Sequence, residues 1–255
     1  MNSQTSTFKM LIDGALVEGD QTMAVINPCT GRPFANSPRA SLRQMEQAIE
    51  AASRSFPAWS RSTMLVRRAL ILKIADLIEE HCQELARLLT QEQGKPLRDA
   101  QAEVHGTVAF FRYVAQCRIE TQILEESTTR HAYLQRQALG VVAVITPWNF
   151  PAAMITRKAG PALAAGCPMI IKPASATPLT ALALCRLAEE AGVPKGILSC
   201  ITGNAGEISD TFCTDMRVRK NIAILLAKGC RVPGVREKMT ALRGMQMMIE
   251  LQDKL

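Results

Sequence analysis

The chain of 255 residues is 47% hydrophobic and 21% charged, a balance typical of soluble globular proteins. Its length allows one large domain or two modest ones. The net charge is +7, and the segment from Arg217 onward, with nine bases and three acids, contributes +6 of it. The remainder is nearly neutral, which argues against a nucleic-acid-binding surface over the whole protein.

The sequence also argues against a membrane protein and against a disulfide framework. No apolar run approaches the roughly 20 residues that cross a bilayer, and residues 1–10 lack the apolar core of a signal peptide. The eight cysteines stand singly, without a CxxC pair or a metal-ligand spacing, at Cys29, Cys82, Cys117, Cys167, Cys185, Cys200, Cys213 and Cys230. We therefore predict a cytoplasmic protein without a metal, with buried thiols at Cys167, Cys185 and Cys200.

The first quarter of the chain contains a hairpin signal, a loop and a helix start. Asp13-Gly14 predicts a turn between two short strands. Residues 28–38 are rich in chain breakers and predict a loop. Ser41 can cap a helix that runs to Ala52, and Trp59 is expected in the connection after it.

Helical patterns then dominate up to residue 119. Apolar residues recur at helical spacing over 63–90, which predicts one long amphipathic helix or a broken pair, stopped at 94–96 by glycine and proline. Another helix is predicted over 99–119. Residues 120–130 are polar and indicate no particular element, whereas 133–139 alternates well enough for a strand.

The chain is organised around the stretch from Leu139 to Ser175. Gly140 precedes an apolar run over 141–145 that predicts a strand buried on both faces. Prolines at 147 and 151 then hold Asn149 on a rigid turn. A helix over 152–165, ended by the glycine at 166, and a second strand over 169–171 complete the unit.

Two further helices and a third strand are predicted after this stretch. Thr177 can cap a helix that runs to Ala191, and the patterns over 197–202 and 208–216 predict a strand and a helix. The alternation over 140–202 predicts an α/β fold with a Rossmann-like parallel sheet and flanking helices. A sheet of only three parallel strands would leave an unpaired apolar edge.

Polar side chains follow the first two strands of this sheet, where ligands bind in such folds. Asn149 follows the first strand, and Lys172 and Ser175 follow the second. Simpler interpretations stand beside this one. Asn149 could cap the next helix, Lys172 could be a solvated lysine at a strand end, and Arg157 could be an ordinary helix-surface charge.

The motifs TPWNFP at 146–151 and KPAS at 172–175, with 23 residues from Asn149 to Lys172, resemble the aldehyde dehydrogenase superfamily. The resemblance is closest to its succinate-semialdehyde dehydrogenase branch, and the segment EQGKP at 92–96 adds to it. It runs from about Met10 to Lys220. It implies the N-terminal, cofactor-binding part of the family's fold, in a truncated form.

Three regions follow from this resemblance. Residues 1–139 are expected to form a helical and β arm that includes part of an oligomerisation hairpin, so that a full-length enzyme would be a homo-oligomer. Residues 140–220 are expected to form a partial dinucleotide-binding βαβαβ unit, and 221–255 a divergent basic tail.

The resemblance also implies the chemistry. The family oxidises an aldehyde through a cysteine thiolate and transfers hydride to a nicotinamide. Asn149 matches the catalytic asparagine whose side-chain amide donates to the oxyanion, a role that suits a preorganised neutral donor. The cofactor-binding residues implied are Thr146, Pro147, Trp148, Asn149, Lys172, Pro173, Ala174 and Ser175.

Three of these matches point to particular ligands. Lys172 matches the lysine that binds the adenine ribose. Ser175 stands where many NAD-preferring relatives carry a glutamate, and its small hydroxyl leaves room for a 2′-phosphate, so NADP is expected, with NAD as the alternative. Arg157 matches an arginine that holds the distal carboxylate of succinate semialdehyde, a task suited to a planar guanidinium.

Beyond Lys220 the family's glycine-serine turn, base glutamate and GQxC segment are not found, and Cys230 lacks the surroundings of a nucleophile. This loss of register is typical of a truncated or frameshifted reading frame. One hypothesis is the N-terminal part of an NAD(P)-dependent succinate-semialdehyde dehydrogenase that retains weak or partner-dependent activity on that aldehyde or a related one. The alternative is a catalytically dead nucleotide-binding or subunit-interaction fragment. Nucleic-acid binding through the basic tail rests on charge alone, and neither a nucleic-acid nor a membrane partner is predicted.

Overall fold

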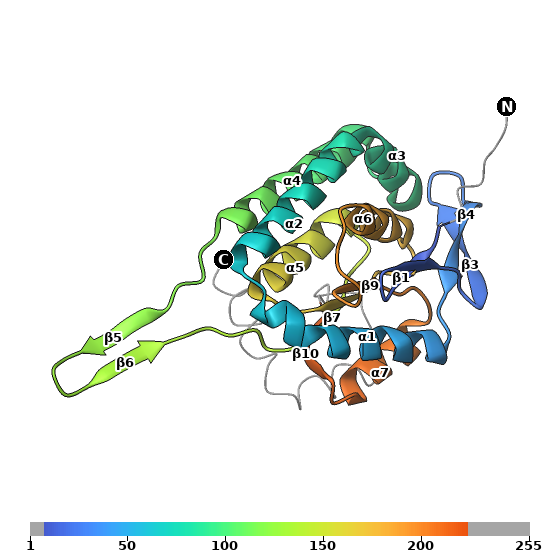
Figure 1. The fold of residues 1–255 in the computed structure, drawn as a ribbon. Helices are drawn as coiled ribbons and strands as arrows, with labels where there is room; N and C mark the ends of the chain where they lie inside the picture. Colours follow the sequence, from blue (N-terminus) through green and yellow to red (C-terminus); the bar gives the residue numbers. More distant parts are fainter. Residues whose placement is uncertain (1–7, 224–255) are drawn as a thin grey trace, which may run out of the picture.

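The structure is a computed structural model that describes residues 8–223, with side chains through residue 220 (Figure 1). Its main sheet has six strands in the order β10-β7-β8-β9-β1-β2, and β7, β8, β9 and β10 run parallel. Helices α5 and α6 cover one face and α1 and α7 the other, while α2, α3 and α4 form an outer layer over α5 and α6. The predicted α/β class with a Rossmann-like parallel sheet is confirmed.

The strands are β1 (Met10–Ile12), β2 (Ala15–Val17), β3 (Gln21–Asn27), β4 (Arg32–Arg39), β5 (Gln122–Glu126), β6 (His131–Leu134), β7 (Val141–Ile145), β8 (Met169–Lys172), β9 (Leu198–Cys200) and β10 (Val218–Ala223). The helices are α1 (Leu42–Arg61), α2 (Met64–Glu80), α3 (Cys82–Gln93), α4 (Leu97–Gln116), α5 (Pro151–Ala165), α6 (Leu179–Glu190) and α7 (Ala205–Thr214).

The parallel strands end at one edge of the sheet. Ile145 of β7 is in register with Lys172 of β8 on one side and with Ala223 of β10 on the other. On the next strand along, Cys200 of β9 is in register with Ile171. The segments that leave β7, β8 and β9 therefore start close together, as the sequence predicted for a ligand-binding edge.

The expectation of an unpaired apolar edge is wrong. A fourth parallel strand, β10, pairs with β7 on the side away from β8, and Leu11 of the N-terminal β1 pairs antiparallel with Cys200 on the other side. The sequence gives little sign of β10, because its first residues include two cations and because the visible resemblance to the family ends at Lys220. Strand β1, from the region predicted to end at 139, thus joins the sheet of the following region, and β10 runs across the boundary predicted at 220.

The core extends over both faces of the sheet and between the helices that cover it. Every residue of β8 is buried, and in β7 only the last residue is partly exposed, because both faces of these strands are covered. Gly160 on α5 lies against Phe111 and Val114 of α4, where an added Cβ would be 3.4 Å from each side chain. The small residues of α5 therefore let α4 and α5 pack closely.

The N-terminal region confirms two predictions and corrects two. Asp13 and Gly14 have positive φ values of 50° and 72°, as the β1–β2 hairpin requires. The predicted loop at 28–38 is wrong, because 32–39 forms β4, paired with β3. Ser41 caps α1 as predicted, and Gln44 completes a capping box with it, but the helix continues through Pro57 to Arg61 and includes the buried Trp59.

The predicted helical segment over 63–90 is a broken pair, α2 and α3, that meets at His81. Gly94 ends α3 with a φ of 87°, as expected for a glycine cap. The polar segment after α4 contains β5, which pairs with β6 in a hairpin that projects from the body (Figure 1). Strand β6 ends at Leu134, shorter than the predicted 133–139.

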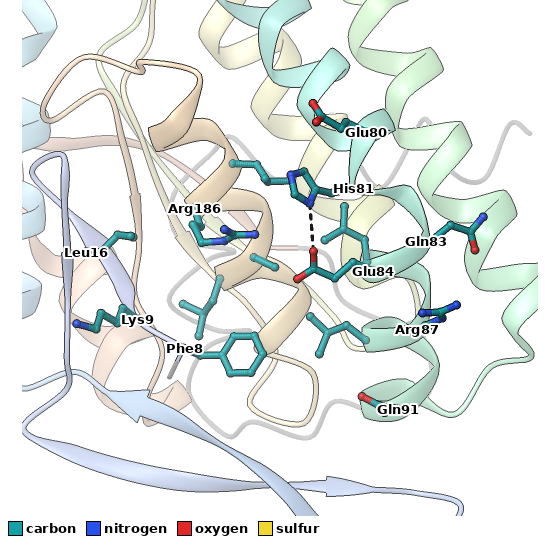
Figure 2. A pocket seen from close by; sticks show the side chains of 15 residues that line it. Phe8, Lys9, Leu16, Glu80, His81, Gln83, Glu84, Arg87, Gln91 and Arg186 are labelled. Atoms are coloured by element: carbon teal, nitrogen blue, oxygen red, sulfur yellow. Dashed lines mark hydrogen bonds and ion pairs between the residues drawn. The ribbon is translucent and has the colours of Figure 1, made fainter. Parts of the chain in front are cut away.

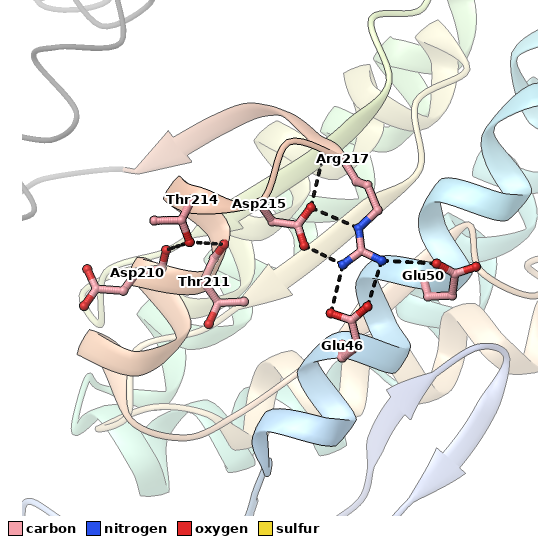
Figure 3. Close-up of polar contacts among 7 residues, drawn as sticks. All are labelled: Glu46, Glu50, Asp210, Thr211, Thr214, Asp215 and Arg217. Atoms are coloured by element: carbon pink, nitrogen blue, oxygen red, sulfur yellow. Dashed lines mark hydrogen bonds and ion pairs between the residues drawn. The ribbon is translucent and has the colours of Figure 1, made fainter.

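Arg217, directly before β10, binds carboxylates of α1 on the face of the sheet that α1 and α7 cover (Figure 3). Its Nε lies 3.0 Å from Asp215 Oδ1, and its Nη1 lies 2.8 Å from Glu46 Oε1 and 3.1 Å from Glu50 Oε2. The guanidinium lowers the pKa of both Asp215 and Glu46 through hydrogen bonding to their ionised forms. We call these four residues the Arg217 cluster.

The thiols of Cys167, Cys185 and Cys200 are buried, as predicted. The Cys185 thiol, through a hydrogen bond, and burial together raise the pKa of Cys200 well above its usual value. Cys230 lies outside the described residues.

Candidate functional site

The two predicted polar segments meet where β7 and β8 end. The backbone N–H of Thr146, directly after β7, donates to the carbonyl of Lys172 at 3.1 Å. This bond continues the parallel ladder past Ile145 and holds the start of the PWNF turn beside the start of the KPAS loop. The arrangement that the spacing of the two motifs predicted is therefore present.

Lys172 is not a solvated strand-end lysine. The residue is only 2% exposed, and its Nζ lies 3.2 Å from the hydroxyl of Ser175. Ser175 in turn donates to the carbonyl of Gly203, in the segment after β9, at 3.1 Å. The KPAS loop is thus tied to a third strand end, and the exposed residue Ser175 lies beside a buried cation.

Asn149 does not cap α5, so that simpler interpretation is wrong. Helix α5 begins after Phe150, and no side chain of its own turn accepts a hydrogen bond from its first N–H groups. Among the described residues, the buried Oδ1 of Asn149 has no hydrogen-bond partner. The predicted catalytic role of Asn149 stays a prediction.

A carboxylate from another helix takes the capping role. Glu103 on α4 accepts hydrogen bonds from the backbone N–H groups of Ala152 at 2.9 Å and Ala153 at 3.1 Å. Lys95 forms an ion pair with Glu103 and donates to the main-chain carbonyl of Asn149 at 3.2 Å. Sequence reasoning missed both residues, although Lys95 lies in the EQGKP segment that marked the family resemblance.

Glu92 of the same segment acts in a similar way on α6. Its carboxylate accepts hydrogen bonds from the backbone N–H groups of Leu179 and Thr180, both at 2.8 Å. The prediction that Thr177 caps this helix is wrong, because the described structure shows no hydrogen bond to its hydroxyl. Burial raises the pKa of Glu92 to about 7, although the hydrogen bonds from Thr180 and Leu179 act in the opposite direction.

The other predicted cofactor-binding residues line the same edge. Trp148 is 51% exposed, and Pro147, Pro173 and Ala174 lie in the two loops that carry Asn149 and Lys172. A hollow of about 310 Å³ separates Trp148 and the segment 175–177 from the β3 strand. Glu92 and Thr177 supply polar groups to this hollow, whose other walls are largely apolar.

Arg157 lies apart from these contacts, exposed on α5. Its neighbour Lys158 is half-buried, and partial burial, together with the positive charge of Arg157, lowers the pKa of Lys158. Among the described residues, no hydrogen bond or ion pair joins Arg157 to Asn149, so the predicted role of Arg157 stays a prediction.

A larger hollow, of about 1060 Å³, lies between α3, α6 and the β1–β2 hairpin (Figure 2). It is lined by leucines and by charged side chains, and the imidazole of His81 is bound to Glu84 at 3.1 Å. Its lining holds no cysteine, serine or threonine, and no predicted site residue lines it. We therefore place the candidate site at the strand ends.

Two kinds of feature are not found in the described part of the chain. No helix within 8–223 is long and apolar enough to cross a membrane. Over the same residues, histidine, cysteine and acidic side chains do not form a cluster that could hold a metal ion.

Parallel strands joined by helices, with a lysine and small polar loops at their carboxyl ends, define an α/β protein of the doubly wound class, in which ligands bind at that edge of the sheet. The sequence profile of the aldehyde dehydrogenase family matches residues 16–223, and the chain belongs to this family. The resemblance seen in the TPWNFP and KPAS motifs is thereby confirmed.

Two relatives illustrate the similarity. The chain is 45% identical over 217 residues to the glutarate-semialdehyde dehydrogenase of Pseudomonas aeruginosa and covers 44% of its length. It is 42% identical over 215 residues to the NADP(+) succinate-semialdehyde dehydrogenase of Escherichia coli K12 and covers 45% of its length. In both matches 82% of this chain is aligned, so the chain spans less than half the length of these relatives.

Solved structures agree. An aldehyde dehydrogenase from Brucella melitensis biovar abortus superposes with a TM-score of 0.83 at 39% identity, over 87% of this chain and 47% of the other. A betaine aldehyde dehydrogenase from Staphylococcus aureus in complex with NAD+ superposes with a TM-score of 0.81 at 32% identity, over 85% of this chain and 45% of the other.

Proposed function

We propose that this chain supplies the nucleotide-binding edge and the oxyanion-binding asparagine of an NAD(P)-dependent semialdehyde dehydrogenase. The observation that carries the proposal is the junction of the two motifs, in which Thr146 is bonded to Lys172 and Lys172 to Ser175 at one strand edge. The aldehyde substrate we favour is succinate semialdehyde or a related aldehyde acid. Family membership and the two similar semialdehyde dehydrogenases support this choice.

The residues at this edge fit a dinucleotide. The ammonium of Lys172 and the hydroxyl of Ser175 are 3.2 Å apart, close enough to bind neighbouring oxygens of one ribose or phosphate. A carboxylate at position 175 would repel a 2′-phosphate, and serine does not, so NADP is favoured over NAD. When bound, the nicotinamide would accept the hydride from the aldehyde, while this chain's residues bind and orient the two reactants.

Asn149 is proposed to stabilise the charge that develops on the aldehyde oxygen. A neutral side-chain amide on a rigid turn can donate to an oxyanion without reorganising, and removal of such a donor typically costs roughly 10²–10³ in rate. The unpartnered state of its Oδ1 among the described residues supports the view that the fold does not use this side chain. Arg157, exposed on α5, is proposed to bind the distal carboxylate of the substrate.

Assembly and location are part of the proposal. The projecting β5–β6 hairpin exposes the apolar side chains of Ile123, Leu124 and Tyr133, which supports a homo-oligomer formed through it. The buried, reduced thiols of Cys167, Cys185 and Cys200 support a reducing, cytoplasmic location.

The test is a titration of the full chain with NADP and with NAD. Trp148 lies on the site turn and Trp59 is buried in α1, so a Trp59→Phe background reports on the site alone. We expect saturable quenching, with tighter binding of NADP, and loss of the response in Lys172→Met. A flat response to both nucleotides would overturn the proposal.

A turnover assay separates the proposed enzyme from its rival, a nucleotide-binding or subunit-interaction protein without catalysis. Purified chain is mixed with NADP and succinate semialdehyde, and the reduced cofactor is followed by absorbance. Formation above background that disappears in Asn149→Ala supports the dehydrogenase. Saturable nucleotide binding without turnover supports the rival for the chain by itself.

A further inference from the structure

The turn that carries Asn149 is held from outside by the corner between α3 and α4. Lys95, two residues after α3, reaches across to this turn. Its Nζ donates to the main-chain carbonyl of Asn149 at 3.2 Å and lies 4.3 Å from the centre of the Phe150 ring. One cation therefore contacts two successive residues of the turn, through a hydrogen bond and a cation–π interaction.

Glu103 holds the other side of the same turn. Its side chain is buried, and Oε1 accepts hydrogen bonds from the backbone N–H groups of Ala152 and Ala153. Its Oε2 forms the ion pair with Lys95. A carboxylate bound to two N–H groups at a helix N-terminus and to a buried cation has its orientation fixed, because each bond depends on charge and direction.

These contacts use only main-chain atoms of the turn and the ring of Phe150. They fix the backbone on both sides of Asn149 and leave its side-chain amide out of the clamp. The amide is thus carried by a backbone whose position is set by residues 46 and 54 positions earlier in the chain. This is how a positioning group acts on a functional side chain.

We propose that Lys95 and Glu103 are positioning residues for Asn149 and set the direction in which its side-chain amide points. The identity of the amide's ligand, an oxyanion, rests on the proposed function. The positioning itself does not, because it follows from contacts within this chain.

The test reads the Asn149 side chain directly by NMR. The two side-chain N–H resonances are assigned in the 15N-labelled full chain by their loss in Asn149→Ala. We expect Lys95→Met to displace or broaden them beyond the line width and to lower the exchange protection of the Ala152 and Ala153 amides by roughly tenfold or more. The matched control Lys73→Met removes an exposed lysine of α2 and should leave all of these signals in place.

A second variant keeps the test valid if Lys95→Met does not fold. Lys95→Met leaves the buried charge of Glu103 unpaired, whereas the double variant with Glu103→Gln removes that charge and keeps one acceptor oxygen for the α5 amides. The double variant should displace the Asn149 resonances as well. If these resonances keep their wild-type positions in the folded variants while the unfolding midpoint falls, Lys95 and Glu103 only stabilise the fold and the proposal is overturned.

NADP titration of the same samples keeps the two proposals distinguishable. A wild-type chain that does not bind nucleotide contradicts the proposed function, but displaced Asn149 resonances would still uphold the positioning role. Unchanged resonances together with normal nucleotide binding would uphold the proposed function and overturn the positioning role.

Discussion

The carboxylate of Glu92, on α3, accepts a 2.8 Å hydrogen bond from the backbone N–H of Thr180, in the first turn of α6. The other carboxylate oxygen binds the N–H of Leu179. A glutamate from a distant helix thus takes the place of an N-cap residue, and it does so next to the KPAS loop that carries Lys172 and Ser175. Since Glu92 is only 3% exposed, its ionisation affects the free energy of unfolding.

We predict that the contribution of Glu92 to the free energy of unfolding falls as pH rises. The pKa of Glu92 is raised from 4.5 to about 7, so the folded protein retains a proton that the unfolded chain releases. The contribution is fully present below pH 4.5 and is lost as pH rises through about 7, by roughly 3 kcal/mol. Glu92→Gln removes the titrating group. The difference in unfolding free energy between this variant and wild type, measured by urea denaturation, should therefore change in favour of the variant by that amount between pH 4.5 and about 7.

The control for this prediction is Glu80→Gln, which removes an exposed carboxylate at the end of α2. It should retain the pH dependence of the wild type. A Glu92→Gln variant that follows the wild-type curve in parallel at every pH would contradict the prediction.

The second prediction concerns the cofactor. Ser175→Glu places a carboxylate beside the Lys172 ammonium, where it would repel a 2′-phosphate. We expect NADP affinity to fall by roughly tenfold or more, with a smaller effect on NAD, measured by fluorescence titration. Thr128→Glu adds the same charge on the exposed β5–β6 turn and should change neither affinity. Equal losses for both nucleotides would point to general damage to the loop.

The third prediction compares two glycines with similar backbones. Gly196 and Gly192 have φ values of 78° and 88°. A Cβ at Gly196 would lie 2.4 Å from the carbonyl oxygen of Ala51, whereas at Gly192 it would meet no atom within 4 Å. We expect Gly192→Ala to cost about 1 kcal/mol of unfolding free energy from strain alone, and Gly196→Ala roughly 1–3 kcal/mol more. Equal costs in urea denaturation would show that the close approach to α1 is not maintained in solution.

The fourth prediction concerns the Arg217 cluster (Figure 3). Arg217→Gln removes the cation that lowers the pKa of Asp215 and Glu46. Because those pKa values are depressed in the folded state, the stabilisation is present above the ordinary carboxylate range and is lost as pH falls through the folded values. We expect a loss of about 1 kcal/mol at neutral pH and low salt, since Glu46 and Glu50 are exposed to solvent.

Two measurements check this expectation. The difference between wild type and Arg217→Gln should shrink both on acidification and in high salt. Arg136→Gln, which removes an exposed arginine after β6, serves as the control for net charge. A difference that is independent of both pH and salt would mean that Arg217 acts through packing of its aliphatic stem instead.

The sheet edge was predictable because its signals are local. The apolar β-branched run at 141–145 and the glycine at 166 each specify their own conformation, and the structure has β7 and a glycine cap at those places. The family motifs then brought Asn149 and Lys172 together. Their shared strand edge needed only the right-handed winding of the βαβ unit.

The wrong predictions concern places where partners distant in sequence decide the structure. Pro33 and Pro38 argued against a strand at 32–39, but they are tolerated because β4 pairs with β3 alone in a two-stranded ribbon. The predicted end at Ala52 missed the last turns of α1, which contain Pro57 and are packed through the buried Trp59. Lys95 and Glu103 gave no local signal of their contacts, because those contacts form only when α4 packs on α5.

The carboxylates of Glu92 and Glu103 determine how the two loops at the strand ends lose their structure when the domain unfolds. Both loops that would grip a nucleotide are fastened by side chains from another helical layer, so neither loop can keep its shape once that layer separates from the sheet. An intermediate with most of its helices intact would therefore have no working nucleotide edge. Nucleotide binding at this edge therefore requires the assembled domain. Protease cleavage at Trp148 would report detachment of α2, α3 and α4 before any loss of the helical circular-dichroism signal.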